Sequence, residues 1–387
     1  MLRFAPSPMG DMDIKDLRIA IINYIVASQK NDRFIIRIED TKKDIEGKDT
    51  EIMQILEKFA LSHDTVSHQS ERLGIHQTLA IKLLEENKAY ICVCNSDECS
   101  ATCENLTKDD YTRVKKSGEK FVIRIKAIDE MDSFIILDRN STPSYNFSCA
   151  CEDMLSGVDF IIADESQISN TQKQKYIKSS LGYETDTTYI HISKLDGGDI
   201  SIKSLFKEGF VPDAILNYLI LLSNTSTPKE IFTLPESIEW FNLSLVSSAK
   251  FDIEKLKFIN REHLKLIDDK SLSTLFGFAD SDIGKLAKVY LQTLSTTKEL
   301  EIKIANIFGD KDFNNKFAED MKVLQKIIKN APYIKEFEEF EKYLSKESGL
   351  NGECLYTPLR LILTNSSDEV DLSSIYPLIK SYLLEII

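Results

Sequence analysis

The chain opens with the stretch MLRFAPSPMGDMDIKDLR, residues 1–18, and this stretch decides the fold class. Its first apolar residues, 2–5, predict a short buried strand, which the prolines at positions 6 and 8 end in a loop. From Asp11 or Asp13 onward, apolar side chains recur at helical spacing as far as about Ser28. A strand that leads through a tight loop into a helix N-terminus is how α/β folds bind phosphate. A buried strand followed by a capped helix, with no ligand, is the alternative interpretation.

The composition is that of an ordinary globular protein, and the 387 residues are enough for two or three domains. No apolar run has the length of a membrane span, and the first residues lack the pattern of a signal peptide, so we expect a cytoplasmic protein. A net charge of −14 argues against general nucleic-acid binding, although a local basic surface can still bind one RNA. We therefore expect neither DNA nor a membrane among its partners.

Four short blocks carry a resemblance to a known family. They are Arg3-Phe4-Ala5-Pro6-Ser7-Pro8, Arg37-Ile38-Glu39-Asp40-Thr41, Gln69-Ser70-Glu71-Arg72 and Pro143-Ser144-Tyr145. With weaker matches through the rest of the chain, they closely resemble glutamyl-tRNA synthetases, which are class I aminoacyl-tRNA synthetases. The resemblance implies a Rossmann-like α/β catalytic domain with an inserted α/β subdomain. A helical stem-contact region and a helical C-terminal domain would follow.

The same resemblance suggests domain boundaries. We expect a catalytic domain split between residues 1–90 and 142–222, around an inserted acceptor-stem-type subdomain at 91–141. The helical stem-contact region would occupy 223–284, and an anticodon-binding-like helical domain 285–387. No internal repeat or long linker interrupts this order.

The resemblance also implies a substrate pocket for glutamate and its ATP partner. An arginine that clamps the glutamate side chain in the family is replaced by alanine here, and a methyl group cannot supply two hydrogen-bond donors. Glu39 has a second interpretation, as a strand-end carboxylate that pairs with Arg3 or Arg37. The positions assigned to the pocket by the resemblance are Arg3, Ala5, Ser7, Glu39, Tyr145 and Ala163.

Two ATP-handling motifs of the family are altered. Its His-Ile-Gly-His-like tetrapeptide is Asp13-Ile14-Lys15-Asp16 here, and its mobile Lys-Met-Ser-Lys-type loop is shortened, leaving Lys194 as a remnant. Losing one preorganised electrostatic contact typically raises a barrier by about 3 kcal/mol. A carboxylate at position 13 would also repel phosphate. We therefore expect weak binding of ATP and Mg²⁺ and no formation of glutamyl-adenylate.

Four cysteines lie within twelve residues, in the pattern Cys92-x-Cys94-x4-Cys99-x3-Cys103. Four thiolates this close together can bind one zinc ion at about 2.3 Å. Many glutamyl-tRNA synthetases hold zinc with a Cys-x-Cys pair at this point, although their other ligands lie farther downstream. Free thiols in a reducing compartment are the alternative.

A helix predicted over residues 252–266 would place Lys257, Arg261 and Lys265 on one face, because they are spaced at i, i+4 and i+8. Such a face can follow the phosphate backbone of an RNA, so these residues are candidates for tRNA contact. A solvated helix face is the alternative.

Three functions compete on these observations. The altered motifs favour a pseudo-synthetase, inactive or impaired, that keeps the scaffold to bind tRNA or a translation-related protein partner. The alternative is a functional glutamate–tRNA ligase, which attaches glutamate to tRNA with ATP through an adenylate. A changed activity, such as another nucleotidyl transfer, is the third.

Overall fold

The fold comes from a computed structural model of the chain. The structure describes residues 1–41, 47–94, 99, 103–106, 108–128, 131–224, 226–367 and 371–387. They form two compact units: unit 1 holds residues 1–203 and 219–251, and unit 2 holds 204–218 and 252–387. The finer division into four parts remains a prediction. No helix in the described part of the chain combines the length and the apolar character that a bilayer crossing needs.

Unit 1 is built around parallel strands. Strand β1 (Leu2–Phe4) pairs with β2 (Phe34–Ile38), and β2 pairs with β3 (Thr65–His68). Strand β7 (Phe160–Asp164) pairs with β8 (Thr188–Ile192). The backbone N–H groups at the start of β7 donate to the carbonyl of residue 1 at 3.4 Å, which places β7 beside β1. The order is therefore β3-β2-β1-β7-β8, a Rossmann-like arrangement whose winding reverses between β1 and β7.

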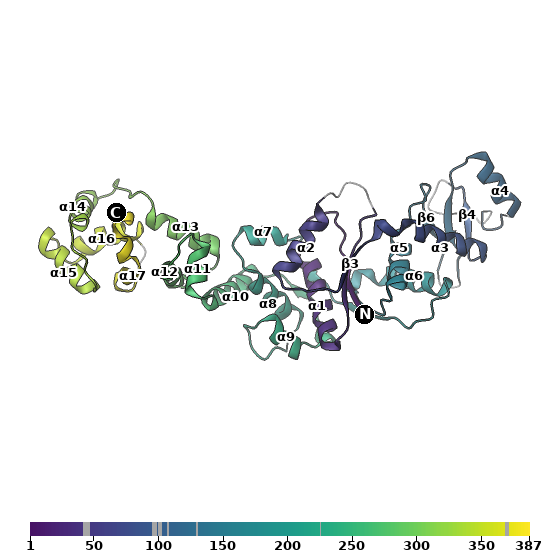
Figure 1. The fold of residues 1–387 in the computed structure, drawn as a ribbon, viewed down its shortest axis with the longest axis horizontal. Coiled ribbons are helices and arrows are strands. Elements are labelled where there is room, and N and C mark those ends of the chain that lie inside the picture. The colour runs from purple at the N-terminus through teal and green to yellow at the C-terminus, as the bar shows by residue number, and fades with distance from the viewer. Residues whose placement is uncertain are drawn as a thin grey trace. The chain divides into compact units, whose positions relative to one another are not determined.

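Helices pack on this sheet as the apolar spacing predicts (Figure 1). Helix α1 (Ile14–Lys30) buries Leu17, Ile21 and Ile25, and it ends at Asn31 in the left-handed conformation that favours helix C-termini. The other helices that lie wholly or partly in unit 1 are α2 (Lys48–Lys58), α3 (Leu73–Glu85), α4 (Lys108–Ser117), α5 (Tyr145–Ser156), α6 (Ile168–Ser180), α7 (Ile202–Lys207), α8 (Pro212–Ser223) and α9 (Leu234–Trp240).

A second sheet in unit 1 is antiparallel. Its strands β4 (Ala89–Cys92), β5 (Val122–Ile125) and β6 (Phe134–Leu137) pair in sequence order. Helix α3 lies beside β4 and β6, and the buried side chains of β5 and β6 share a core with α3, α5 and α6 (Figure 1). This sheet and the helices on it confirm the inserted α/β part of the fold class. A further short pair joins β9 (Leu195–Asp196) to β10 (Ala249–Lys250).

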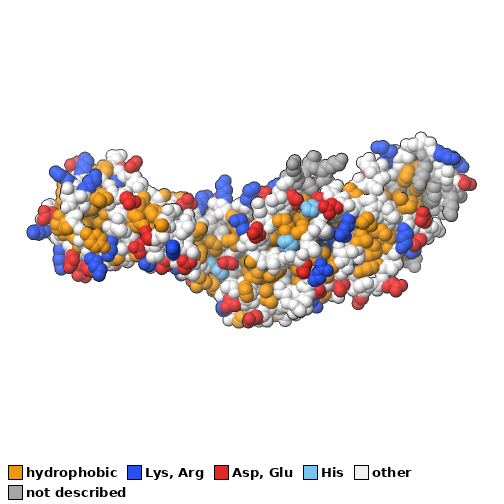
Figure 2. Space-filling view, in the orientation of Figure 1, with side chains coloured by type: hydrophobic (Ala, Val, Ile, Leu, Met, Phe, Trp, Pro, Cys, Tyr) orange, Lys and Arg blue, Asp and Glu red, His pale blue; other side chains and the backbone are white. Residues whose placement is uncertain are grey.

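The described part of unit 2 is helical, as expected for the C-terminal region. Its core includes Phe340 stacked on Tyr376, with ring centroids 4.5 Å apart. On the face drawn in Figure 2, basic and acidic side chains are interspersed over the helices from α13 to α17. Besides parts of α7 and α8, the helices are α10 (Ile253–Leu266), α11 (Asp269–Leu275), α12 (Asp282–Tyr290), α13 (Thr297–Phe308), α14 (Ala318–Lys329), α15 (Phe337–Ser348), α16 (Glu353–Thr364), α17 (Leu372–Ile379) and α18 (Leu383–Ile386).

Candidate active site

A cleft of about 330 Å³ opens where β1 and β7 end, at the point where the winding of the sheet reverses. Open α/β sheets bind their ligands at this point, so the position itself indicates a binding site. We call it the Arg3 cleft. Its lining includes all six pocket residues that the resemblance implies, and no role of any of them is tested by this placement. They are Arg3, Ala5, Ser7, Glu39, Tyr145 and Ala163.

A second cleft of about 390 Å³ adjoins the first, and Asp16 and Asp164 line both. We call it the Lys15 cleft, because Lys15 and Lys194 contribute its two basic side chains. The altered ATP motifs contain four charged residues, and three of them, Lys15, Asp16 and Lys194, line this cleft. Asp13, the fourth, is not part of the lining.

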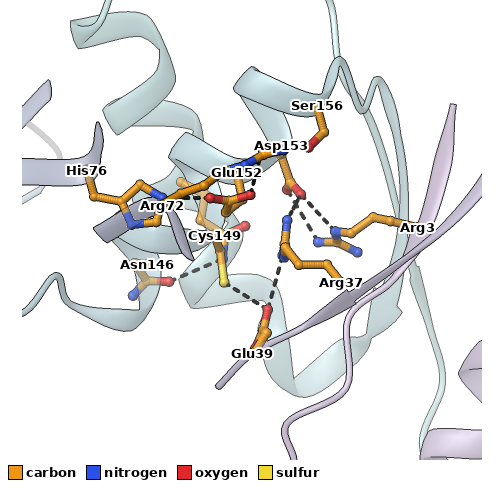
Figure 3. A network of polar contacts seen from close by, with 11 residues as sticks. Arg3, Arg37, Glu39, Arg72, His76, Asn146, Cys149, Glu152, Asp153 and Ser156 are labelled. Atoms are coloured by element: carbon orange, nitrogen blue, oxygen red, sulfur yellow. Dashed lines mark hydrogen bonds and ion pairs between the residues drawn. The ribbon is translucent and has the colours of Figure 1, made fainter. Parts of the chain in front are cut away.

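The floor of the Arg3 cleft is a buried network of charges (Figure 3). Asp153, on α5, is fully buried and accepts hydrogen bonds from Arg3 Nε at 2.9 Å and from Arg37 Nη1. Burial alone would raise the pKa of Asp153, but the two arginines outweigh it and hold the pKa at about 2. Arg37 Nη2 also donates to Glu39 Oε1 at 3.0 Å. This pairing of Glu39 with Arg37 confirms the second interpretation of Glu39, which nevertheless still lines the cleft.

A second layer of polar contacts supports this floor (Figure 3). Cys149 Sγ donates to Glu39 Oε1 at 3.2 Å, and burial together with the charge of Glu39 raises the pKa of this thiol well above its usual range. Glu152 is fully buried and contacts His76 Nε2 at 2.8 Å and Arg72 Nη1 at 3.1 Å. These contacts join α5 to α3 and to β2. The charged groups below the cleft are therefore held in place without any ligand.

The N-terminus of α1, beside the Lys15 cleft, is closed by the chain's own acids. Asp13 is the N-cap residue, and its carboxylate accepts from the backbone N–H groups of Lys15 at 2.8 Å and Asp16 at 2.9 Å. Lys15 Nζ lies 2.6 Å from a carboxylate oxygen of Asp199. The donors that a phosphate group would use at this helix end are thus satisfied by carboxylates.

The walls shared by the two clefts are acidic. Burial, together with the nearby charge of Asp13, raises the pKa of Asp16 to about 6. Ala163 presents only a methyl group, and the carboxylate of Asp164 accepts from the N–H of Ser166 at 2.9 Å. The resemblance implies an arginine at position 163. Apart from Arg3, the lining of the Arg3 cleft includes no basic side chain that could take its place.

The four clustered cysteines converge within unit 1. The Sγ atoms of Cys92, Cys94, Cys99 and Cys103 all lie within 4.8 Å of one another. The Sγ atoms of Cys92 and Cys99 lie 3.3 Å apart, and those of Cys94 and Cys103 lie 3.4 Å apart. Ligand sulfurs at about 2.3 Å from a tetrahedral ion are separated by similar distances. The cluster is therefore able to hold one metal ion.

The three candidate tRNA contacts lie on α10, as their spacing predicts. Lys257 pairs with Glu254 at 2.9 Å, and Lys265 pairs with Glu262 at 2.6 Å. Arg261 donates to Ser295 Oγ at 3.0 Å. The face is therefore less positive than the sequence pattern alone suggests.

Sequence reasoning missed the buried members of the site. Asp153 stands in a segment that resembles the family, but nothing in that segment reveals its partners 150 and 116 residues away. Lys178 is buried on α6, and its burial could have been predicted from the spacing of residues on this helix. Thr171, Gln174 and Lys178 are spaced at i, i+3 and i+7, which is the spacing of a buried helix face.

Comparisons with known proteins agree with this geometry. Residues 1–126 and 119–258 match the family model described as class I tRNA synthetases (E and Q), catalytic domain. The chain is 52% identical to glutamate–tRNA ligase 2 of Sulfurovum sp. (strain NBC37-1), with 100% of both chains covered. It is 43% identical to glutamate–tRNA ligase 2 of Sulfurimonas denitrificans, again with 100% of both chains covered. A crystal structure of a glutamate tRNA ligase from Elizabethkingia meningosepticum superposes with a TM-score of 0.80 at 20% identity, covering 100% of this chain and 98% of that one, which shows the fold.

The alignment with the Sulfurovum relative also shows a difference in length. It runs over 427 positions, whereas this chain has 387 residues, so about 40 positions fall opposite gaps in this chain. Across its full length, this chain belongs to the glutamate–tRNA ligase family of class I aminoacyl-tRNA synthetases.

Proposed function

We propose that this chain is a glutamate–tRNA ligase, which uses ATP to activate glutamate in the clefts of unit 1 and then transfers it to tRNA. The observation that carries the proposal is the convergence of Arg3, Ser7, Glu39 and Tyr145 in one cleft at the reversal point of the sheet. Arg3 is suited to a substrate carboxylate and Glu39 to a substrate ammonium group. Full-length relatives at 52% and 43% identity carry the name of this activity. Charging of tRNA would place the protein in the cytoplasm.

A second candidate is a pseudo-synthetase that binds tRNA or a protein partner without forming the adenylate. The cap that Asp13 forms on α1 is the specific observation in its favour, because it satisfies the donors of Lys15 and Asp16. Ala163 supports it too, since a methyl group cannot clamp a carboxylate. The fold would then be kept for its shape.

ATP–pyrophosphate exchange with glutamate and tRNA distinguishes the two candidates. The ligase predicts exchange above background that an Arg3→Ala change abolishes. A matched control is Arg33→Ala, because this arginine near the start of β2 has a side chain 58% exposed and lies 3.8 Å from the surface carboxylate of Asp64. If the protein retains tRNA at low salt but gives no pyrophosphate exchange above background, the ligase is rejected in favour of the second candidate.

We infer that the metal held by the cysteine cluster is zinc. Four sulfur ligands suit zinc better than magnesium or calcium, which prefer oxygen. Burial raises the pKa of Cys99 to about 12 in the absence of a metal, and a coordinating zinc ion would supply the charge that deprotonates it. In this position the ion would join β4 to the segment that follows it.

Metal analysis of protein purified without chelator tests this inference. We expect about one zinc per chain, lost in the double variant Cys92→Ser, Cys94→Ser. The control is the double variant Cys149→Ser, Cys151→Ser, because these buried cysteines on α5 lie outside the cluster and should leave the zinc content unchanged. A folded protein without metal would leave the free-thiol alternative in place.

For tRNA, we propose contact through Lys257, Arg261 and Lys265 on α10. Binding should weaken steeply with salt, because each phosphate contact releases about one counterion. Reversing the charge of Lys257 and Arg261 together should abolish binding. Reversing Lys322, which is paired with Glu319 in the same i, i+3 manner on α14, is the control and should change little. Unchanged retention in the double variant would exclude α10 as the contact surface.

A further inference from the structure

One buried charge in unit 1 is not explained by the fold. Lys178, on α6, is 4% exposed, and its Nζ has no hydrogen-bond partner among the described residues. Its ammonium group lies over the rings of Tyr189 and Tyr183, 5.5 Å and 5.9 Å from their centroids. Lysine is almost never fully buried unless it is paired, because an ion in an apolar interior is costly. The position therefore calls for a compensating anion.

The groups around Lys178 do not supply that anion in full. Its electrostatic neighbours are Asp153, Arg3 and Arg37. Asp153 already binds both arginines, and Glu39 pairs with Arg37. The cluster thus contains three cations, Arg3, Arg37 and Lys178. Its carboxylates are two, Asp153 and Glu39, so one positive charge is in excess. The pKa of Lys178 agrees with this count, because desolvation lowers it and the attraction of Asp153 does not make up the difference.

The cluster that carries the excess charge reaches the Arg3 cleft through Arg3. Arg3 belongs both to the cluster and to the lining of the cleft, and its side chain is 11% exposed. Its Nε and Nη2 atoms donate to Asp153, which leaves Nη1 without a partner among the described residues. An anion that entered the cleft at Arg3 would neutralise the cluster without any rearrangement of the buried groups.

We propose that Lys178 determines specificity for an anionic amino acid: it shares the charge of Asp153 from below, so that Arg3 is free to bind the substrate's side-chain carboxylate from above. Lys178 is thus a positioning residue, which acts through Asp153 and Arg3 and does not touch the substrate. The role offsets the absence of an arginine at position 163. The identity of the ligand as glutamate rests on the proposed function, whereas the requirement for a carboxylate rests on the charge count.

The experiment measures melting temperature and amino-acid binding in variants of the full chain. Lys178→Met removes the charge and keeps the length of the side chain, and Lys178→Arg keeps the charge. Lys175→Met is the matched control, because Lys175 lies one turn earlier on α6, is exposed, and has its ammonium group 4.9 Å from the centroid of the same Tyr189 ring. The probes are L-glutamate and its neutral isostere L-glutamine.

The proposal predicts opposite effects of Lys178→Met on the free and the ligand-bound protein. The melting temperature of the free protein should rise, because an uncompensated buried charge is removed. The dissociation constant for glutamate should increase by about tenfold or more, and that for glutamine by less than about threefold. Lys178→Arg should keep the preference for glutamate, and Lys175→Met should resemble the wild type in every measurement.

Other results overturn the proposal. If Lys178→Met lowers the melting temperature and leaves the glutamate-to-glutamine preference unchanged, Lys178 is only a structural partner of Asp153. A wild-type protein that binds neither amino acid at millimolar concentration also rejects it.

Pyrophosphate exchange separates this proposal from the ligase proposal. Exchange with an unchanged KM for glutamate in Lys178→Met rejects the role of Lys178 alone. Lys178-dependent glutamate binding without any exchange rejects the ligase alone.

Discussion

The two adjoining clefts of unit 1 differ in what holds their charged residues. In the Arg3 cleft, Arg3 and Glu39 are tied to Asp153 and Arg37 in a buried network, and they match the positions that the family resemblance implies. In the Lys15 cleft, the charged residues are at or near the surface. Lys15 pairs there with Asp199, whose side chain is 88% exposed.

This difference suggests why one cleft resembles the family and the other departs from it. Replacing Arg3 or Glu39 would leave a buried charge with one partner fewer, so these two residues matter for folding as well as for binding. Residues around the Lys15 cleft contribute little to folding, because exposed ion pairs stabilise proteins weakly. Asp13 even stabilises α1 as its N-cap. Changes that weaken nucleotide binding can therefore accumulate there without loss of the fold.

The largest effect is expected from Asp153→Ala. The change would leave Arg3 and Lys178 without a carboxylate partner and Arg37 with Glu39 alone. Breaking a buried ion pair typically costs about 3–5 kcal/mol of the free energy of unfolding. Chemical denaturation measures this loss. Asp159→Ala is the control, because the side chain of Asp159 is half exposed and should contribute no more than about 1 kcal/mol. Equal effects of the two variants would show that the buried ion pairs of Asp153 stabilise the protein no more than an exposed one.

The same network predicts how stability depends on pH. The pKa of Asp153 is lowered from 3.8 to about 2, so its contribution is complete above the unfolded value and is lost as the pH falls from about 4 towards 2. In Asp153→Ala this part of the acid unfolding curve should be flatter than in the wild type. Melting temperatures between pH 2 and 5 give the comparison, and parallel curves would show that Asp153 does not carry the transition.

A smaller effect is expected at the other cleft, from Asp13→Ala. Loss of an N-cap costs about 1 kcal/mol of stability. The N–H groups of Lys15 and Asp16 would become available to a phosphate, so Mg-ATP should raise the melting temperature of the variant more than that of the wild type. Asp11→Ala, which removes an exposed partner of Lys48, is the control for loss of negative charge nearby. A variant that is neither less stable nor more responsive to ATP would show that the cap does not block this helix end.

The sequence predicted the elements of the fold well where their signals are local. Helical spacing predicted α1 to within two residues at its C-terminal end. The apolar run at residues 34–38 is a local signal of the same kind for β2, and the alternation at residues 121–125 is one for β5. The order of the parallel strands came only from the family resemblance, because no local pattern states which strands are neighbours.

The site was predictable only as far as the resemblance extended. Arg3, Glu39 and Tyr145 were placed correctly in one cleft because they stand in blocks that resemble the family. The excess charge at Lys178 was not predictable, because it depends on Asp153 and Arg3, which meet α6 only in the folded chain. The capping of α1 by Asp13 was open to prediction, since aspartate is a preferred N-cap residue and position 13 was already expected to begin the helix.

The smallest effect concerns Asp16, which lines both clefts and so joins the two sides of the comparison. Its pKa is raised from 3.8 to about 6, which means that the folded protein holds the proton more tightly than the unfolded chain. The resulting stabilisation is complete below about pH 4 and is lost as the pH rises through about 6. Asp16 is exposed at the surface and is desolvated only by the cleft walls around it, so solvent screens the effect on stability. The effect on ligands should be easier to measure: at pH 5.5 the neutral carboxyl no longer repels phosphate, and Mg-ATP should bind more tightly than at pH 7.5. Asp16→Asn should make the affinity independent of pH over this range, and added salt should reduce the wild-type difference. If the wild type shows the same ATP affinity at both pH values, the charge of Asp16 does not act on the nucleotide.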